Sequence, residues 1–296
     1  MKALVDADIL GYEFGGMVQL EDPEQPLEWE IVRSMVDDRI NQILENTGST
    51  EHALYLTDSP SNFRVGVATI KPYKGHRKAE KPFHWAAIRQ HLIDNWNAEV
   101  QYGIEADDRL GIEQMLDFDR SYHIIGENAT DDMVDKDLCE TVICSRDKDL
   151  HMIPGWHYVW PAGKQEEQFW FQDELSAIRC FYKQLLTGDT SDNILGLYGV
   201  GSSSKLVKSI QEMEEEQLMF NLVFKAYEDR FGTWAKAAMW ENAGLLWILR
   251  ENPVEVPFFD SIIMSPETEI SKRLDELLSE YNNEEEKEQT ESTSGL

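Results

Sequence analysis

The sequence predicts an α/β fold with a doubly wound, mostly parallel sheet, followed by a helical region. Three observations predict this fold. Short apolar runs alternate with amphipathic segments in the first part of the chain, three of these runs end next to an aspartate, and the chain becomes continuously helical in pattern from about residue 174. With 296 residues, 42% of them hydrophobic, the chain can bury one large core or two moderate ones.

The predicted strands place acidic residues at one edge of the sheet. Residues 3–5 end at Asp6, residues 52–57 end at Asp58, and residues 141–145 end just before Asp147. In an open parallel sheet the binding site lies outside the carboxyl ends of the strands. We therefore expect these three carboxylates to meet at the same rim. Shorter strands are expected at 157–160 and 168–171.

Helices are expected between these strands. Residues 26–48 carry apolar side chains near helical spacing, and Pro82 opens a helix towards Trp96. Residues 103–116 begin a third helix, with acids in its first turn as the helix dipole favours. Residues 59–82 are polar and basic with no clear period. The low-complexity acidic tail, 282–296, is predicted to be disordered.

Charge limits the kinds of partner that the chain can bind. The formal net charge of −29 argues against a broadly basic nucleic-acid surface, so a DNA contact must be local. The segment KPYKGHRKAEK (71–81) supplies such a local basic patch, with five Lys or Arg residues. No apolar run reaches membrane length, and the N-terminus does not resemble a signal peptide. The three cysteines have no metal-ligand spacing, so we expect a cytoplasmic protein without zinc.

Five acidic clusters indicate a metal site. A single cluster is more simply a set of solvated loop acids, but five clusters at predicted strand ends and helix starts favour a shared function. Oxygen ligands without nearby His or Cys favour Mg²⁺ or Mn²⁺, and two such ions about 4 Å apart can support an in-line phosphoryl displacement. The candidate ligands are Asp6, Asp58, Glu105, Asp107, Asp108, Asp147, Asp149, Asp189 and Asp192.

The last cluster runs directly into a glycine-rich turn, in GDTSDNILGLYGVGSSSK (188–205). A glycine turn that opens a helix offers free backbone N–H groups to an anion. The stretch therefore predicts a phosphate contact beside a metal ligand.

Taken as an ordered set, these motifs resemble the 5′-nucleases of the flap endonuclease superfamily, and most closely the bacteriophage-type 5′→3′ exonucleases. The resemblance covers roughly residues 3 to 210. The motifs that carry it are VDAD (5–8), TDSPSNFR (57–64), YKGHR (73–77), EADD (105–108), SRDKDL (145–150) and GDTSDNILGLYGVG (188–201). It implies a PIN-like nuclease domain over 1–173 with a short basic arch segment at 59–82, and a helix–three-turn–helix DNA-binding region over 174–281.

The resemblance also implies roles for single residues. It assigns Asp6, Asp58, Glu105, Asp107 and Asp108 to a first metal and Asp147, Asp149, Asp189 and Asp192 to a second, with Asp107 essential for catalysis. Lys74 and Arg77 would engage the scissile phosphate, and Tyr73 would stack on the terminal base. Gly196, Gly199, Gly201, Ser202, Lys205 and Lys208 would bind one backbone of the duplex, with K⁺ as a further cation at the turn.

The activity implied is a Mg²⁺- or Mn²⁺-dependent 5′→3′ exonuclease in DNA replication. Its partner would be double-stranded DNA with a 5′ end, nick or flap, and its substrates extend to RNA primers in RNA–DNA hybrids. We expect a monomer that binds no membrane and acts in the cytoplasm, which is the host cytoplasm if a phage encodes the chain.

Two other interpretations remain open at this point. The chain departs from the family pattern at Ala7, where glycine is usual, and at Asp8, an extra acid that we do not assign as a ligand. VDAD with GDTSDN also resembles the haloacid dehalogenase phosphatases, in which Asp6 would be the nucleophile and Asp8 the general acid. A structure-specific DNA-binding protein that does not cut is the second alternative.

Overall fold

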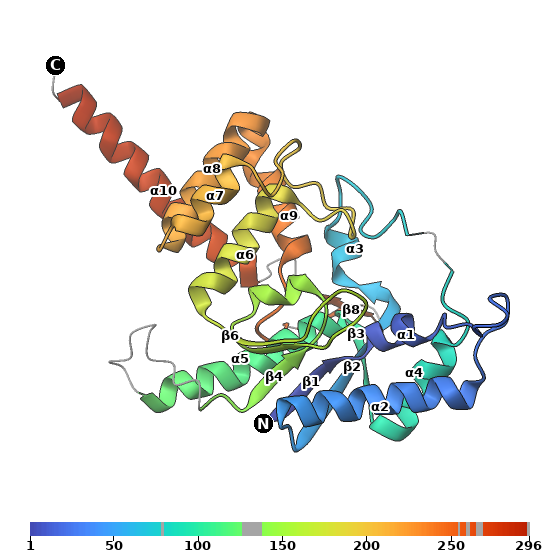
Figure 1. Ribbon diagram of the computed structural model, residues 1–296. Helices are drawn as coiled ribbons and strands as arrows, with labels where there is room; N and C mark the ends of the chain where they lie inside the picture. Colours follow the sequence, from blue (N-terminus) through green and yellow to red (C-terminus); the bar gives the residue numbers. More distant parts are fainter. Residues whose placement is uncertain (78–79, 126–137, 254, 259–260, 265–268, 295–296) are drawn as a thin grey trace. The chain divides into compact units, whose positions relative to one another are not determined.

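The computed structural model describes residues 1–77, 80–125, 138–253, 255–258, 261–264 and 269–294. Figure 1 shows the course of the chain through these residues. The chain forms two compact units, each built from three segments. The first, the sheet unit, contains Met1–Asn62, Arg77–Glu174 and Ile248–Asn252, and the second, the helical unit, contains Phe63–His76, Leu175–Trp247 and Pro253–Leu296.

The sheet unit is built on a six-stranded sheet in the order β3-β2-β1-β4-β5-β6. Its strands are β1 (Lys2–Asp6), β2 (Glu51–Asn62), β3 (Glu99–Gly103), β4 (Thr141–Cys144), β5 (Gly155–Val159) and β6 (Gln168–Gln172). All neighbours are parallel except β5 and β6, which pair antiparallel. The predicted α/β fold with a mostly parallel sheet is therefore confirmed. The edge strand β3 was not predicted, because its polar and apolar residues form no clean apolar run.

Helices cover both faces of this sheet. They are α1 (Asp8–Phe14), α2 (Trp29–Thr47), α4 (Trp85–Trp96) and α5 (Ala106–Ile125), with a 3₁₀ helix, η3, at Lys148–Met152. Leu54 and Leu56 of β2 join one core with side chains of α1, α2 and α4. Tyr55, between them, points to the other face, where Arg109 of α5 lies over its ring at 6.0 Å. The sheet is thus doubly wound.

Helix α2 is confirmed, but its buried face is only partly the predicted one. Val32, Val36, Ile40 and Ile43 are fully buried at helical spacing, whereas the predicted period included Ile31, which is 49% exposed. The helix begins at Trp29 rather than Pro26, and it ends at Gly48, whose φ of 63° is the left-handed conformation that glycine adopts readily.

The helical unit contains one short helix from the predicted arch segment and the C-terminal helices. Its elements are α3 (Phe63–Val67), α6 (Glu174–Thr187), α7 (Lys205–Glu212), α8 (Glu216–Phe231), η4 (Gly232–Trp234), α9 (Ala235–Leu246), the hairpin β7 (Glu255–Phe258) and β8 (Ser261–Met264), and α10 (Glu269–Ser294). Its core includes the fully buried rings of Phe181, Phe220 and Tyr227. The helical region predicted from about residue 174 is present as a series of separate helices, whereas the β7–β8 hairpin was not predicted.

The two units differ from the expected domain boundaries in three places. The chain leaves the sheet unit at Glu174, next to the expected boundary at 173, but residues 63–76 of the expected arch segment belong to the helical unit. The guanidinium of buried Arg64 explains this, because it donates to the carbonyl oxygens of Leu245 and Trp247 at the end of α9. Residues 248–252 return to the sheet unit. The tail predicted to be disordered, 282–296, is helical as far as Ser294, and residues 295–296 lie outside the described part.

Within the described residues, we find no helix that combines the length and apolarity needed to cross a membrane.

Candidate active site

Asp6 stands at the carboxyl end of β1 and is the most informative of the predicted ligands. Its side chain is 4% exposed, and its Oδ2 accepts a hydrogen bond of 2.9 Å from the hydroxyl of Ser145. Ser145 directly follows β4, whose Cys144 pairs with Val5 of β1. The parallel register therefore brings the ends of two strands together, as the strand-end argument predicted.

Ser145 also links Asp6 to the acids of the SRDKDL motif. The backbone N–H of Asp147 donates to Ser145 Oγ at 3.0 Å, and Asp147 Oδ1 accepts the N–H of Asp149 at 2.9 Å. This second bond caps the 3₁₀ helix η3. The Asp149 carboxylate lies 3.5 Å from Lys148 Nζ. One hydrogen-bonded chain thus connects three of the predicted ligands: Asp6, Asp147 and Asp149.

The charge of Asp6 is poorly compensated. Burial raises its pKa to about 8, and the negative charges of Asp8 and Asp147 add to this rise, against the lowering effect of the Ser145 hydrogen bond. A carboxylate in this setting either keeps its proton or gains a cation. The carboxyl end of the central strand β1, at Asp6, is therefore electrostatically suited to bind a positive ion.

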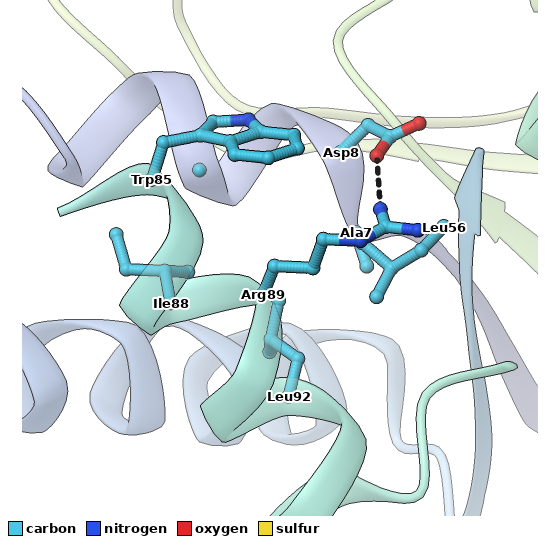
Figure 2. Close-up of a pocket in the computed structure, with 8 residues that line it drawn as sticks. Ala7, Asp8, Leu56, Trp85, Ile88, Arg89 and Leu92 are labelled. Atoms are coloured by element: carbon cyan, nitrogen blue, oxygen red, sulfur yellow. Dashed lines mark ion pairs between the residues drawn. The ribbon is translucent and has the colours of Figure 1, made fainter. Parts of the chain in front are cut away.

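Asp8, the extra acid, has two partners of its own, Thr57 and Arg89. Its Oδ2 accepts the N–H of Thr57 at 2.9 Å, and its Oδ1 lies 3.6 Å from an Arg89 nitrogen. Figure 2 shows this ion pair at a small pocket, beside the ring of Trp85. Burial raises the pKa of Asp8, while the Thr57 hydrogen bonds and the charges of Arg89 and Lys81 lower it. The pocket is lined by Ala7, Asp8, Gly11, Leu56, Trp85, Ile88, Arg89 and Leu92.

The EADD motif starts helix α5, next to the end of β2. Thr57 Oγ1 accepts the N–H of Ala106 at 2.9 Å, which fixes the first turn of the helix against the strand. Asp108 is fully buried, and its two oxygens accept the N–H groups of Glu105 (2.9 Å) and Leu249 (3.1 Å). Asp108 therefore has a structural role at this helix start, whatever else it binds. Glu105 is buried and Asp107 half-buried beside it.

Asp58 lies in an irregular part of β2. The pairing of β2 with β3 shifts register between Thr57 and Asn62, and Asp58 falls within this shift as a half-buried residue. A break in register re-aims side chains at the end of a strand.

The sheet unit supplies the right donors for a hard cation but no preformed cage. Among the residues that the structure describes, no group of three or more His, Cys, Asp or Glu side chains stands close enough to hold a metal. The donors along the hydrogen-bonded chain are all oxygens, and Asp6 adds a buried acceptor without a cation. This donor chemistry fits Mg²⁺ or Mn²⁺ rather than zinc.

Asp189 of the helical unit shapes the turn that follows α6. Its Oδ1 accepts the N–H groups of Ser191 (2.6 Å) and Asp192 (3.2 Å), and its backbone exchanges two hydrogen bonds with Ile194. Gly188 and Gly196 pack backbone to backbone inside this turn, where a Cβ on Gly196 would meet Gly188 N at 2.3 Å. Asp189 is buried by this arrangement.

Tyr73 and Lys74, two residues expected to contact DNA, bind Asp192 within the helical unit. The Tyr73 hydroxyl donates to Asp192 Oδ2 at 2.8 Å, and Lys74 Nζ lies 3.6 Å from the same oxygen. Lys74 N also donates to the Asp192 carbonyl oxygen. Tyr73 is only 9% exposed, so this structure does not offer its ring to a terminal base, contrary to expectation. Arg77 is exposed and belongs to the sheet unit, and residues 78–79 of the basic segment lie outside the described part.

Of the remaining predicted DNA contacts, Gly196 is buried inside the turn, and the other five are exposed on the surface of the helical unit. Gly199 and Gly201 are exposed, with no atom within 4 Å of the position a Cβ would take, and Ser202 is exposed beside them. Ser204 caps α7 by accepting the N–H of Val207 at 3.3 Å. Lys205 and Lys208 are exposed on the same helix.

Sequence reasoning missed three residues that organise the sheet edge: Ser145, Thr57 and Arg89. Two of them carried a usable signal, because Ser145 and Thr57 are hydroxyl residues at predicted strand ends, directly where the acids were expected. Arg89 carried none, since its partner Asp8 is distant in sequence.

The fold is similar to that of solved bacteriophage T5 proteins, although no family model matches the chain and no curated protein matches it significantly. The T5 D15 protein co-crystallised with metal ions aligns over 83% of this chain and 88% of its own, with a TM-score of 0.53 and 14% identity. A mutant of T5 5′-exonuclease aligns over 83% and 86%, with a TM-score of 0.52 and 13% identity. These two alignments show a shared fold.

Proposed function

We propose that this chain is a divalent-metal-dependent 5′→3′ exonuclease that hydrolyses phosphodiester bonds from the 5′ ends of duplex DNA, with RNA primers and 5′ flaps as related substrates. The observation that carries the proposal is the hydrogen-bonded chain from Asp6 through Ser145 to Asp147 and Asp149, at the carboxyl ends of parallel strands. It occurs on the fold that T5 5′-exonuclease has.

The proposal gives the acidic clusters of the sheet unit a role. Asp6, Asp58, Glu105, Asp107 and Asp108 would hold one ion, and Asp147 and Asp149 would be ligands of a second. Divalent ions bound there would supply the charge neutralisation that an in-line displacement at phosphorus requires. The chemistry needs no covalent intermediate on the protein, and the products would be 5′-phosphorylated mononucleotides or short oligomers.

The protein's own groups would position the substrate and the ligands. Ser145 holds Asp6 by a hydrogen bond, and the Thr57 hydroxyl holds the first turn of α5, where Asp107 stands. Lys74 and Arg77 would neutralise charge that develops on the scissile phosphate. Lys74 must exchange its contact with Asp192 for the phosphate when substrate binds. The turn after α6 would bind the duplex, with K⁺ as a further cation there.

The test follows both ends of one strand. A duplex labelled at its 5′ end and the same duplex labelled at its 3′ end are incubated with Mg²⁺ or with EDTA. The proposal predicts early release of the 5′ label and stepwise shortening of the 3′-labelled strand, with no cleavage in EDTA. Asp107→Asn should abolish both.

The matched control is Asp38→Asn, which removes an exposed carboxylate of α2 in the same unit and should leave cleavage unchanged. Retention of the duplex without cleavage would instead support the non-cutting DNA-binding protein. Hydrolysis of a small phosphate ester without any action on DNA would support the phosphatase.

A further inference from the structure

Tyr198 is an aromatic side chain displayed to solvent in the middle of the glycine turn. It is 79% exposed, the most exposed of the large apolar side chains described in the helical unit. A single exposed aromatic residue needs no special explanation. The surroundings of this one do distinguish it.

The backbone on both sides of Tyr198 is firmly held. Leu197 is buried, and its N–H donates to the carbonyl oxygen of Leu186 at the end of α6 at 2.9 Å. The carbonyl oxygen of Tyr198 itself accepts a hydrogen bond of 2.6 Å from the Arg230 guanidinium of α8. Val200 N–H donates back to Leu197 O at 3.0 Å. The ring therefore projects from a preorganised turn, so little conformational entropy remains to be lost when it binds a partner.

The backbone that follows the ring is open, and two exposed lysines come after it on α7. Gly199, with φ of 86°, and Gly201 have no atom within 4 Å of a built Cβ, so another backbone can approach this turn closely. Lys205 and Lys208 are exposed on α7, which starts four residues after Gly201. An aromatic ring that is followed by two open glycines and then by exposed lysines suits a groove flanked by phosphates.

We propose that Tyr198 inserts its ring into the minor groove of duplex DNA and packs on the sugars and base edges, while the turn and the lysines contact the phosphates. The inference rests on the proposed function, because it takes duplex DNA as the partner. Apolar wedges in the minor groove and aromatic contacts to bases both tolerate any sequence, which a nuclease acting at 5′ ends requires.

The ring and the lysines should leave different signatures in binding. Removal of an aromatic contact lowers affinity at every salt concentration without changing the slope of log K against log salt. Removal of one phosphate contact lowers that slope by about 0.9. A salt series therefore separates the role proposed for Tyr198 from a charge effect.

The experiment measures anisotropy of a short dye-labelled duplex in EDTA, which prevents the proposed hydrolysis, across about 50–200 mM salt. Tyr198→Ala should weaken binding about tenfold with an unchanged slope. Tyr198→Phe should bind like the wild type, because it keeps the ring. Lys205→Gln should flatten the slope.

Tyr102→Ala is the matched control, since Tyr102 is 73% exposed on β3 of the other unit and should not affect binding. Equal affinities of Tyr198→Ala and the wild type would overturn the inference, and so would equal losses in Tyr198→Ala and Tyr102→Ala. Absence of duplex binding in the wild type would also overturn it.

These outcomes are separable from those of the nuclease assay. If the wild type releases the 5′ label in Mg²⁺ and Tyr198→Ala binds duplex normally, the proposed nuclease activity is supported and the role of Tyr198 is rejected. If the wild type does not cut and Tyr198→Ala binds duplex about tenfold more weakly, the proposed nuclease activity is rejected and the role of Tyr198 is supported.

Discussion

At the scale of single residues, Asp6 is buried beside two other acids. Its folded-state pKa of about 8 is far above its ordinary value of 3.8, so the folded protein keeps a proton that the unfolded chain releases. Without metal, the contribution of Asp6 to stability is therefore greatest below about pH 4 and is lost as the pH rises towards 8.

The first prediction concerns Asp6→Asn. Asparagine keeps an acceptor for Ser145 but carries no charge. In EDTA at pH 8, the unfolding free energy of the variant should therefore be higher than that of the wild type by on the order of a few kcal/mol. At pH 5 the difference should be much smaller. Urea unfolding at the two pH values measures this. The control is Asp38→Asn, and a difference independent of pH would contradict the buried charge.

The second prediction concerns Tyr73, whose hydroxyl donates to Asp192. Tyr73→Phe keeps the ring and loses this bond, so it should lower the unfolding free energy by about 1–2 kcal/mol. Tyr102→Phe, at an exposed position, should be neutral. If Tyr73→Phe were equally neutral, the Tyr73–Asp192 hydrogen bond would contribute nothing to stability. The expected role of Tyr73 in stacking on a terminal base would then be the better interpretation.

The sequence located the acids but not the groups that hold them. Asp6 and Asp147 were found because a parallel sheet collects strand ends at one edge. Ser145 and Asp6 are 139 residues apart, and Thr57 and Asp8 are 49 apart, so no local pattern connects them. The burial of Tyr73 likewise could not be predicted from the sequence, because it depends on a turn more than a hundred residues away.

At the scale of elements, the turn after α6 depends on two glycines in contact. Gly188 and Gly196 both have positive φ, 67° and 55°, and each occupies the space that a side chain on the other would need. A glycine-rich sequence predicted a turn here, and the contact explains why two of the glycines cannot be replaced.

The third prediction compares two glycines of this turn. Gly196→Ala should lower the unfolding free energy by at least about 2 kcal/mol, since it adds backbone overlap to an unfavourable φ. Gly201→Ala, in open space, should change it by less than about 0.5 kcal/mol. Thermal unfolding of both variants measures the contrast, and similar losses would contradict the packing described.

Element prediction succeeded where one local signal dominated. The buried runs of β1, β2 and β4 and the apolar period of α2 were sufficient. The sequence prediction missed strand β3, because this edge strand is only half-buried and so has no continuous apolar run. The acidic tail was predicted to be disordered from its composition, but Glu, Gln and Lys also have high helix propensity, consistent with α10 continuing to Ser294.

At the scale of the whole molecule, net charge −29 and a nucleic-acid partner are compatible only if charge is arranged locally. Acids gather at the edge of the sheet, where cations would neutralise them, and exposed lysines follow the glycine turn.

The fourth prediction is that Mg²⁺ raises the melting temperature. A ligand that binds only the folded state at a hundred times its Kd stabilises it by about 2.7 kcal/mol, which amounts to several degrees for a chain of this size. Calorimetry with Mg²⁺ against NaCl of equal ionic strength measures the shift. Asp6→Asn should largely abolish it, and an equal rise in NaCl would indicate general screening only.

The fifth prediction concerns the return of residues 248–252 to the sheet unit. Leu249 N–H satisfies the buried Asp108, and the Arg250 guanidinium donates to Met152 O. A chain ending at residue 247 should therefore be less stable than the full chain and inactive in the 5′-label assay, although it contains every predicted metal ligand. Cleavage at the normal rate by this truncated chain would contradict the role of the segment.

The same segment sets an order of events during synthesis on the ribosome. The sheet unit receives its last residues only after the first two segments of the helical unit have been translated in full. A nascent chain would carry its acidic edge unfinished, with an oxygen of Asp108 lacking its Leu249 donor, until Asn252 has left the exit tunnel. Completion of the proposed metal site is thereby tied to translation as far as Asn252, so a fragment that stops earlier would lack the activity proposed above.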